Sequence, residues 1–134
     1  MFNFEKLDVW QKAIGFADLV YNHTRHFPVD ERFGLTNQMR RAAVSISSNI
    51  AEGRSRISQT DFGRFIEIAT GSVFEVVSQA FVGRRQGFLN EEASARCTWQ
   101  PRKLGACSAD CENRWRPNNL MGVPGNLSTI SDQL

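Results

Sequence analysis

The chain has 134 residues, a formal charge of +2 and an ordinary share of hydrophobic residues, which suits a single domain. The small charge surplus does not by itself indicate nucleic-acid binding, and no apolar run reaches the roughly 18 residues that a membrane helix needs. There is no basic-then-apolar N-terminal segment, and the three cysteines are odd in number and late in the chain. The sequence therefore favours a cytoplasmic location without disulfides and without a membrane.

The first predicted helix spans residues 8 to about 25. Its apolar side chains recur at helical spacing, and we expect Asp8 and Gln11 to form a capping box at its start. The following Phe-Pro pair ends it, because a residue before proline is disfavoured in helical geometry. His23 and His26 have no carboxylate or cysteine at ligand spacing, so we expect a favourable position at the negative helix end rather than a metal site.

The second predicted helix, residues 35–52, is the segment around which the chain is organised. Its apolar residues form one stripe at helical period, made of Leu35, Met39, Ala42, Ala43, Ile46 and Ile50. Small residues beside this stripe allow neighbouring helices to approach closely. We expect Gly53 just after the last turn, where a left-handed backbone conformation is cheap only for glycine.

The third predicted helix begins at Ser58, with Asp61 as its capping-box partner, and ends near Gln86. A continuous apolar face runs along it. Gly71 and Ser72 in its middle lower the helix propensity, by about 1 kcal/mol for the glycine, and close packing is expected to compensate. The connections between these helices are short, so consecutive helices should be antiparallel neighbours.

A fourth helix is expected to start at Asn90, which can cap it, with two glutamates in its first turn. The composition then changes, because no phenylalanine follows Phe88 whereas all three cysteines and three of the four prolines do. We therefore predict a helical bundle domain, residues 1–92, and an atypical, irregular or disordered tail, residues 93–134. The fold class is all-α, an up-and-down antiparallel helix bundle with three clear helices and a missing or atypical fourth.

Candidate functional residues are polar side chains of the second and third helices. The candidate nucleic-acid contacts, which would bind phosphates, are Arg40, Arg41, Arg54, Arg56 and Arg64. A structural motif is assigned to Asn49, Glu52, Gly53, Ser72 and Glu75. Glu75 could pair with Arg41 across the two helices. Solvated helix faces and inter-helix hydrogen bonds are the more common explanation of such polar residues.

The sequence carries no recognisable catalytic motif. It has no glycine-rich phosphate loop and no HExxH segment, and the cysteines of the CxxxC segment, Cys107 and Cys111, have no histidine near them in the tail. We therefore predict that the protein is not an enzyme and holds no cofactor or metal.

Several segments resemble the four-helix bundle proteins encoded in intervening sequences of bacterial 23S rRNA genes. They are FEKLDVWQKA (4–13), HFPVDERFGLTNQMRRAAVSISSNIAEG (26–53), FGRFIEIATGSVFEV (62–76) and SQAFVGRRQGFL (78–89), which together cover 65 of the 89 residues from 4 to 92. The resemblance implies an up-and-down bundle, a ring-like homo-oligomer that is commonly a pentamer, and no established enzymatic activity. The chain is also similar to the accessory variability proteins of diversity-generating retroelements, which carry a basic surface and bind a reverse transcriptase and nucleic acid.

The chain departs from this family after Glu92, where the family continues with a charged, leucine-rich amphipathic helix. We hypothesise that the reading frame shifts near Ala93. Translation of the gene beyond codon 92 in the other two frames should then give an amphipathic helix in one of them, and its absence from both would reject the shift. Each side chain left uncovered by a lost helix forfeits about 1.5–3 kcal/mol, so we expect marginal stability or aggregation unless self-association or the tail covers the groove.

Two functional hypotheses stay open. The first is a non-catalytic, oligomeric, nucleic-acid-associated accessory module that binds RNA or DNA through the arginines above. The second is a structural or scaffolding oligomer that binds a protein partner without nucleic acid. The resemblance slightly favours the first, whose mark would be an affinity for structured RNA that falls steeply with salt, because phosphate binding releases counterions.

Overall fold

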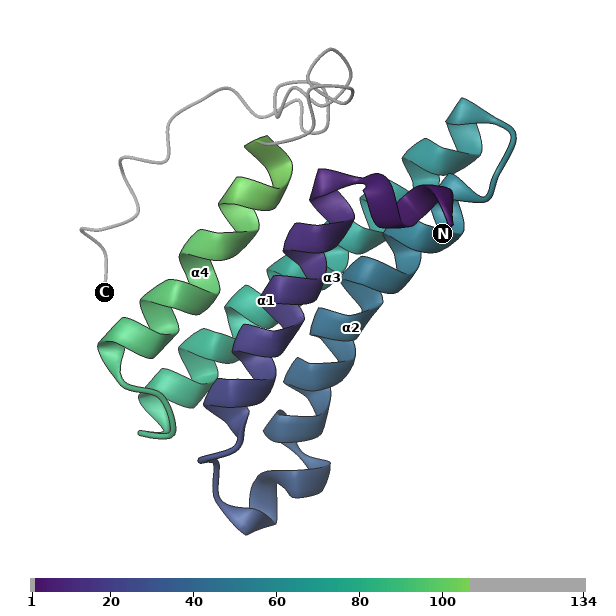
Figure 1. The fold of residues 1–134 in the computed structure, drawn as a ribbon. Helices are drawn as coiled ribbons and strands as arrows, with labels where there is room; N and C mark the ends of the chain where they lie inside the picture. The colour runs from purple at the N-terminus through teal and green to yellow at the C-terminus, as the bar shows by residue number, and fades with distance from the viewer. Residues whose placement is uncertain (1, 107–134) are drawn as a thin grey trace, which may run out of the picture.

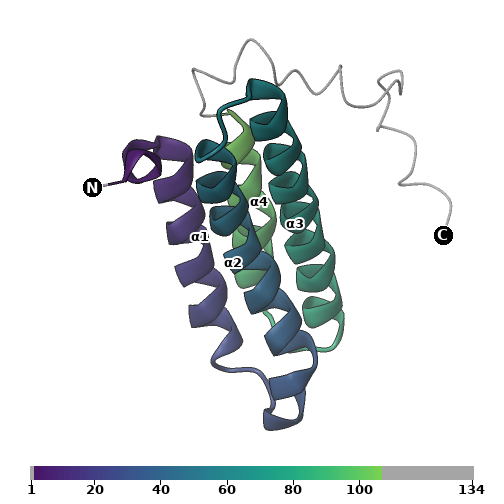
Figure 2. The ribbon, with the colours of Figure 1, turned by 90° about the vertical axis from the view of Figure 1, so that its right-hand side faces the viewer.

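Four helices form an antiparallel up-and-down bundle in the computed structural model, which describes residues 2–106 and, for residues 99–106, the backbone alone (Figures 1 and 2). The helices are α1 (Asp8–Thr24), α2 (Leu35–Arg54), α3 (Gln59–Arg85) and α4 (Glu91–Ala106). Two short 3-10 helices, η1 (Asn3–Lys6) and η2 (Val29–Phe33), precede α1 and α2. The described residues contain no strand, so the predicted all-α class is confirmed.

Each helix packs against two others. Helix α2 lies between α1 and α3, and α4 closes the bundle by packing against α1 and α3 on the side away from α2 (Figure 2). The connections between consecutive helices are short, which makes consecutive helices antiparallel neighbours, as expected. The apolar stripes of all four helices therefore converge on one interior.

The predicted stripe of α2 forms the centre of this interior. Met39, Ile46 and Ile50 are almost completely buried, and the alanines between them are buried as well. Phe16 and Val20 of α1 fill the space beside them. Burial of each such large side chain contributes about 1.5–3 kcal/mol, so the helices are held by tertiary packing more than by helix propensity.

The predicted N-cap residues of the two later helices are confirmed, but the return bond from Asp61 that would complete the capping box with Ser58 is absent from the described residues. The Ser58 hydroxyl accepts a hydrogen bond from the backbone N–H of Asp61 at 3.5 Å and caps α3. The Asn90 side-chain oxygen accepts one from the backbone N–H of Ala93 at 2.7 Å, at the start of α4. Each cap satisfies a backbone donor that the first helical turn leaves without a partner.

The capping box expected at the start of α1 is wrong. Leu7 occupies the N-cap position, because η1 leads directly into the helix. The carboxylate of Asp8 instead forms an ion pair with Lys12 at 2.6 Å, and the Gln11 amide donates to the backbone oxygen of Glu5 at 3.0 Å. Gln11 therefore ties α1 to the segment before it, whereas Asp8 forms a pair within the first turns of α1 itself.

Gly53 does not end α2 in a left-handed conformation, which corrects the sequence interpretation. It lies buried inside the last turn, and α2 continues to Arg54. A Cβ atom at Gly53 would lie 2.7 Å from the Cβ of Phe65 and 2.9 Å from the ring of Phe62. The absence of a side chain is therefore required by the close approach of α3, and not by the backbone conformation of α2.

The left-handed glycine of this bundle is Gly87, after α3. Its φ is 77°, and no other residue in the described part of the chain has a positive φ. The backbone N–H of Phe88 donates to the oxygen of Gly83 at 2.8 Å, and that of Gly87 donates to Arg84 at 3.0 Å. This pair of bonds is a Schellman motif, which turns the chain from α3 towards α4.

The irregular structure expected from Ala93 onward is wrong for residues 93–106, which continue α4. Leu89, Ala93 and Cys97 are buried in the common core, and the latter two lie one helical turn apart. Over these turns α4 covers the groove that a lost fourth helix would have left open. The rest of the predicted tail, residues 107–134, lies outside the described residues, and the frameshift remains a hypothesis.

The burial of Cys97 makes its reactivity a probe of α4 docking. Burial raises the pKa of its thiol to about 11, which leaves a thiolate fraction of about one in a thousand at about pH 8. In a chain carrying Cys107→Ser and Cys111→Ser, we expect alkylation of Cys97 to be about a hundredfold or more slower in native buffer than in denaturant. Equal rates in the two conditions would show that α4 does not stay docked.

Candidate nucleic-acid interface

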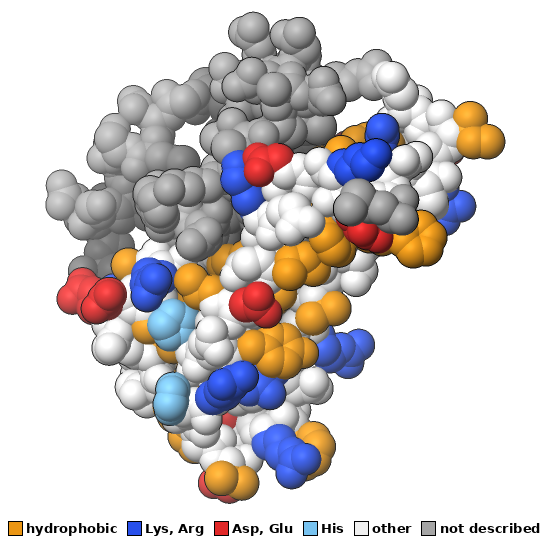
Figure 3. Space-filling view, in the orientation of Figure 1, with side chains coloured by type: hydrophobic (Ala, Val, Ile, Leu, Met, Phe, Trp, Pro, Cys, Tyr) orange, Lys and Arg blue, Asp and Glu red, His pale blue; other side chains and the backbone are white. Residues whose placement is uncertain are grey.

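The five candidate arginines fall into two groups in the bundle. Arg54, Arg56 and Arg64 surround the turn between α2 and α3, at one end of the molecule. Arg40 and Arg41 lie in the first half of α2, nearer to the opposite end. On the face drawn in Figure 3, Lys and Arg side chains alternate with exposed hydrophobic ones instead of forming one continuous basic patch.

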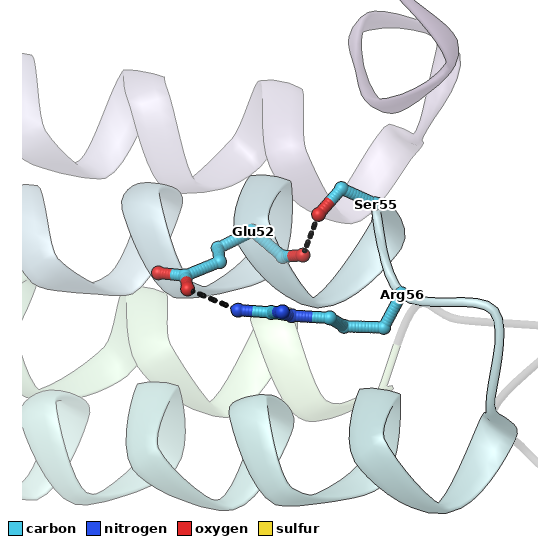
Figure 4. A network of polar contacts seen from close by, with 3 residues as sticks. All are labelled: Glu52, Ser55 and Arg56. Carbon is cyan, nitrogen blue, oxygen red and sulfur yellow. Dashed lines mark hydrogen bonds and ion pairs between the residues drawn. The ribbon is translucent and has the colours of Figure 1, made fainter.

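Two arginines at the α2–α3 turn are paired with carboxylates. Arg56 donates to the Glu52 carboxylate at 2.7 Å, and the Ser55 hydroxyl donates to the backbone oxygen of Glu52, also at 2.7 Å (Figure 4). Arg64 lies 3.6 Å from Asp61. Exposed pairs of this kind contribute about 0–1 kcal/mol, yet they reduce the positive potential of the turn. Arg54 is the one member of this group that forms no ion pair within the described part of the chain.

A cleft of about 500 Å³ lies beside Arg40 and Arg41, where α2 meets α1. Its lining consists of one aromatic residue, two arginines, one aliphatic residue and three small polar residues, namely Tyr21, Asn37, Arg40, Arg41, Val44, Ser45 and Ser48. No carboxylate lines it, and neither arginine forms an ion pair among residues 2–98. The cleft therefore carries two positive charges that the nearby side chains do not neutralise.

Arg40 is held in place by two contacts with α1. Its Nε donates a 2.8 Å hydrogen bond to the hydroxyl of Thr24, which is buried and itself donates to the backbone oxygen of Val20 at 2.8 Å. Its guanidinium carbon lies 4.8 Å from the centre of the Tyr21 ring, which is a cation–π contact. These contacts engage Nε and leave the terminal N–H groups of Arg40 for an anionic ligand.

A hydrogen-bond network joins α2 to α3 through the predicted structural motif. The hydroxyl of Ser72 donates to that of Ser45 at 2.9 Å, across the two helices. The Asn49 amide donates to the backbone oxygen of Ser45 at 2.7 Å and to its hydroxyl at 3.0 Å. The structure thus brings Asn49 and Ser72 together at Ser45, with Gly53 two turns further along the same interface.

The family model of the 23S rRNA-intervening sequence protein matches residues 5–106, which include all four helices. This chain belongs to that family. The match continues beyond residue 92, where the sequence resemblance was expected to end.

This intervening sequence protein also shares its fold with a solved structure. The crystal structure at 1.70 Å of a protein with unknown function from the S23 ribosomal protein family of Bacteroides thetaiotaomicron aligns with a TM-score of 0.66 and 22% sequence identity. The alignment covers 72% of this chain and 90% of that one, and at this identity it supports the fold alone. The comparison with curated proteins gave no match.

The cross-helix pair expected in this intervening sequence protein between Arg41 and Glu75 is wrong. The ion pairs of the described residues do not include it, and Glu75 instead accepts a 3.0 Å hydrogen bond from the Gln79 amide, one turn along α3. Glu75 and Arg41 are both exposed, so water can solvate each charge without a partner. Arg41 is therefore left to face the cleft.

Sequence reasoning missed three residues of the cleft and its network. Tyr21 belonged to the apolar stripe expected for the first helix, but it is 40% exposed and forms a wall of the cleft. Thr24 anchors Arg40, and Ser45 connects Asn49 to Ser72. The sequence offered two signals for these contacts. Tyr21 lies at the edge of an apolar stripe, where its ring can face solvent, and Ser45 lies one turn before Asn49, where the two side chains can bond.

Among the residues described, no group of three or more His, Cys, Asp and Glu side chains is arranged to hold a metal ion. His23 lies at the seam between α1 and α4, where burial lowers its pKa below 6.5. The positive charge of Arg96 lowers this pKa further, Glu92 raises it, and His26 lowers it slightly. This histidine therefore favours its neutral form in the folded protein.

The shifted pKa of His23 predicts a loss of stability in acid. As the pH falls below 6.5, the unfolded chain binds the proton more readily than the folded one, so the free energy of unfolding should decline. Above this pH the contribution of His23 is fully present. Urea unfolding at about pH 7.5 and about pH 5.5 should show this decline, and His23→Gln should reduce it. An equal decline in both proteins would assign the pH dependence to other groups.

Proposed function

We propose that this protein is a non-catalytic, oligomeric accessory module of the cytoplasm that binds nucleic acid along the cleft face of α2. The observation that carries the proposal is the tandem pair Arg40 and Arg41 over a cleft without a carboxylate. Such a pair attracts phosphates, and a guanidinium fork matches phosphate oxygens in geometry. The first arginine is already ordered by Thr24 and Tyr21, so less side-chain entropy is lost on binding.

Arg54, at the end of α2, extends this surface on the side of Arg40, because 14 residues at about 100° per residue return to nearly the same helix face. Arg54 lies 13 residues after Arg41, which corresponds to about 20 Å along a helix at about 1.5 Å per residue. A nucleic-acid backbone of a few nucleotides spans such a distance. Arg56 and Arg64 lie beyond α2, in the following turn and in α3. They rank lower in the proposal because each is paired with a carboxylate, although exposed pairs break at little cost.

The test of this proposal is the salt dependence of RNA binding. We expect structured RNA to bind the purified protein at low salt, with the logarithm of the affinity falling linearly as the logarithm of the salt concentration rises. The slope counts the phosphates that the protein neutralises. Absence of binding at low salt, or an affinity that does not change with salt, would overturn the proposal.

A second candidate function, a scaffolding oligomer that binds a protein partner, draws on the outer face of α3. This face exposes Ile68, Phe74, Phe81 and Val82, with Gly71 open to solvent among them. Helix α3 contains a strongly apolar segment of 18 residues, yet only 28% of this segment is buried in the bundle. This segment is apolar and long enough to cross a membrane, contrary to the sequence expectation, although core helices of soluble proteins pass the same test.

The exposed apolar face of α3 is of the kind that binds another protein surface. Both candidate functions include self-association, and a homo-oligomer, by family resemblance a pentamer, is part of the proposal. The candidates differ in whether nucleic acid binds. Light scattering with and without RNA measures both properties in one experiment.

Charges placed on the outer face of α3 should weaken self-association. We expect Phe74→Glu with Phe81→Glu to lower the molar mass measured by light scattering, because a buried carboxylate at an interface is costly. The helical circular dichroism should stay unchanged, since these side chains are 63% and 52% exposed. Ile57→Glu, at a fully exposed position in the α2–α3 turn, is the matched control. An unchanged mass in the double variant would exclude this face.

A further inference from the structure

Arg40 differs from an ordinary surface arginine because its position is set before any ligand arrives. A buried hydroxyl holds its Nε at 2.8 Å, and an aromatic ring lies 4.8 Å from its guanidinium carbon. The part of the side chain that remains for a ligand is the pair of terminal nitrogens. Two terminal nitrogens held in a fixed position favour an anion with two or more oxygens. In nucleic acids this anion is phosphate.

The other polar groups of the cleft add donors along α2 on both sides of the arginines. Arg41 supplies a second, exposed guanidinium, Asn37 lies one turn before it, and Ser48 lies two turns after it on α2. A phosphate oxygen can accept from each of these groups. No acidic side chain lines the cleft to compete for the donors.

An apolar wall completes the cleft. Tyr21 and Val44 are 40% and 41% exposed there, so each presents apolar surface to a ligand. The volume of about 500 Å³ is larger than a bare phosphate needs, and the cleft is open to solvent on its outer side. A ligand that fills the cleft therefore joins a phosphate to a flat or apolar group.

From these features we infer that the cleft is a subsite for one nucleotide unit. The phosphate binds Arg40 and Arg41, and the attached sugar and base lie against Tyr21 and Val44. This inference rests on the proposed function. It narrows the proposed ligand from any phosphate-bearing nucleic acid to a nucleotide whose base is not stacked in a duplex. The unit is either a free mononucleotide or a nucleotide of a single strand, because a base inside a duplex is stacked and cannot reach the wall.

The chain offers a built-in probe for this subsite, because Tyr21 is its only tyrosine. Protein labelled with 3-fluorotyrosine gives one ¹⁹F resonance, which reports on the cleft wall. We would titrate the full chain with inorganic phosphate, with adenosine 5′-monophosphate, with a short single-stranded RNA and with the same RNA as a duplex. Arg41→Gln removes a cleft charge at an exposed position, and Arg85→Gln is the matched control of equal charge change at the end of α3.

The inference expects the single strand or the mononucleotide to shift the resonance at a concentration at least tenfold lower than inorganic phosphate or the duplex does. Arg41→Gln should weaken this response about tenfold or more, whereas Arg85→Gln should leave it unchanged. A response to phosphate equal to that of the nucleotides would show that the wall takes no part, and would overturn the inference. An RNA-bound protein with an unmoved resonance would overturn it too, while leaving the proposed function intact. A shift with the mononucleotide, in a protein that binds no RNA, would support the subsite and reject the proposed function.

Discussion

Replacement of Gly53 by alanine should destabilise the bundle by about 1–3 kcal/mol, although alanine is the better helix former by about 1 kcal/mol. The added Cβ would lie 2.7 Å from the Cβ of Phe65, which moves only if the backbone of α3 moves. It would also meet the ring of Phe62 at 2.9 Å. The helices must therefore separate near the turn that joins them, and this separation loosens the packing around Ile50.

The measurement is the free energy of unfolding from denaturant titration, compared with two glycine controls. Gly71 and Gly15 lie inside helices with open space where a Cβ would stand, so alanine at either position should stabilise the protein by about 0.5–1 kcal/mol. The free energy of unfolding should therefore fall in Gly53→Ala and rise in the two controls. This difference in sign distinguishes the effect of close packing from that of helix propensity. A Gly53→Ala protein as stable as these controls would refute the close approach of α2 and α3.

Replacement of both cleft arginines by glutamine should weaken RNA binding about tenfold or more and lower the salt slope by about 2, because each arginine neutralises about one phosphate. Glutamine keeps much of the side-chain length and removes the charge. Arg40 also loses its bond to Thr24, so the folded state of the double variant should be checked by thermal unfolding. Fluorescence anisotropy over a range of salt concentrations gives both the affinity and the slope.

The tandem arginines Arg84 and Arg85 supply the matched control for this double variant. Their replacement by glutamine makes the same change in net charge at the end of α3, outside the lining of the cleft. Arg84 forms a 3.3 Å ion pair with Glu91, so thermal unfolding should be measured for this variant as well. We expect this control to change affinity by less than about threefold, through general attraction only. Equal losses in the two double variants would mean that RNA responds to the net charge of the protein and not to the cleft.

Helical periodicity was enough to predict the bundle from the sequence. The stripe of α2 and the caps at Ser58 and Asn90 depend on spacing along one helix, which residue order shows directly. The family could be identified for the same reason, since its characteristic segments are continuous. The end of α4 was misjudged because the tail composition suggested irregular structure, whereas small side chains such as Ala93 and Cys97 fit against the neighbouring helices.

The candidate site was predicted only in part. Five arginines were predicted as phosphate contacts, although two of them have a carboxylate at ion-pair spacing: Glu52 lies four residues before Arg56, and Asp61 lies three residues before Arg64. The sequence could not show that Tyr21 and Thr24, on another helix, hold Arg40 in place. Thr24 and Tyr21 lie 16 and 19 residues before Arg40, and spacing along one helix does not choose among partners on another helix.

The sequence by itself determined where the first three helices lie, which face of each is apolar and to which family the chain belongs, because each of these depends on neighbours along the chain. The tertiary structure decided why Gly53 is a glycine, which arginines remain without a carboxylate and where the cleft opens. These properties depend on distances between side chains of different helices. Such distances exist only after the apolar stripes have packed against one another.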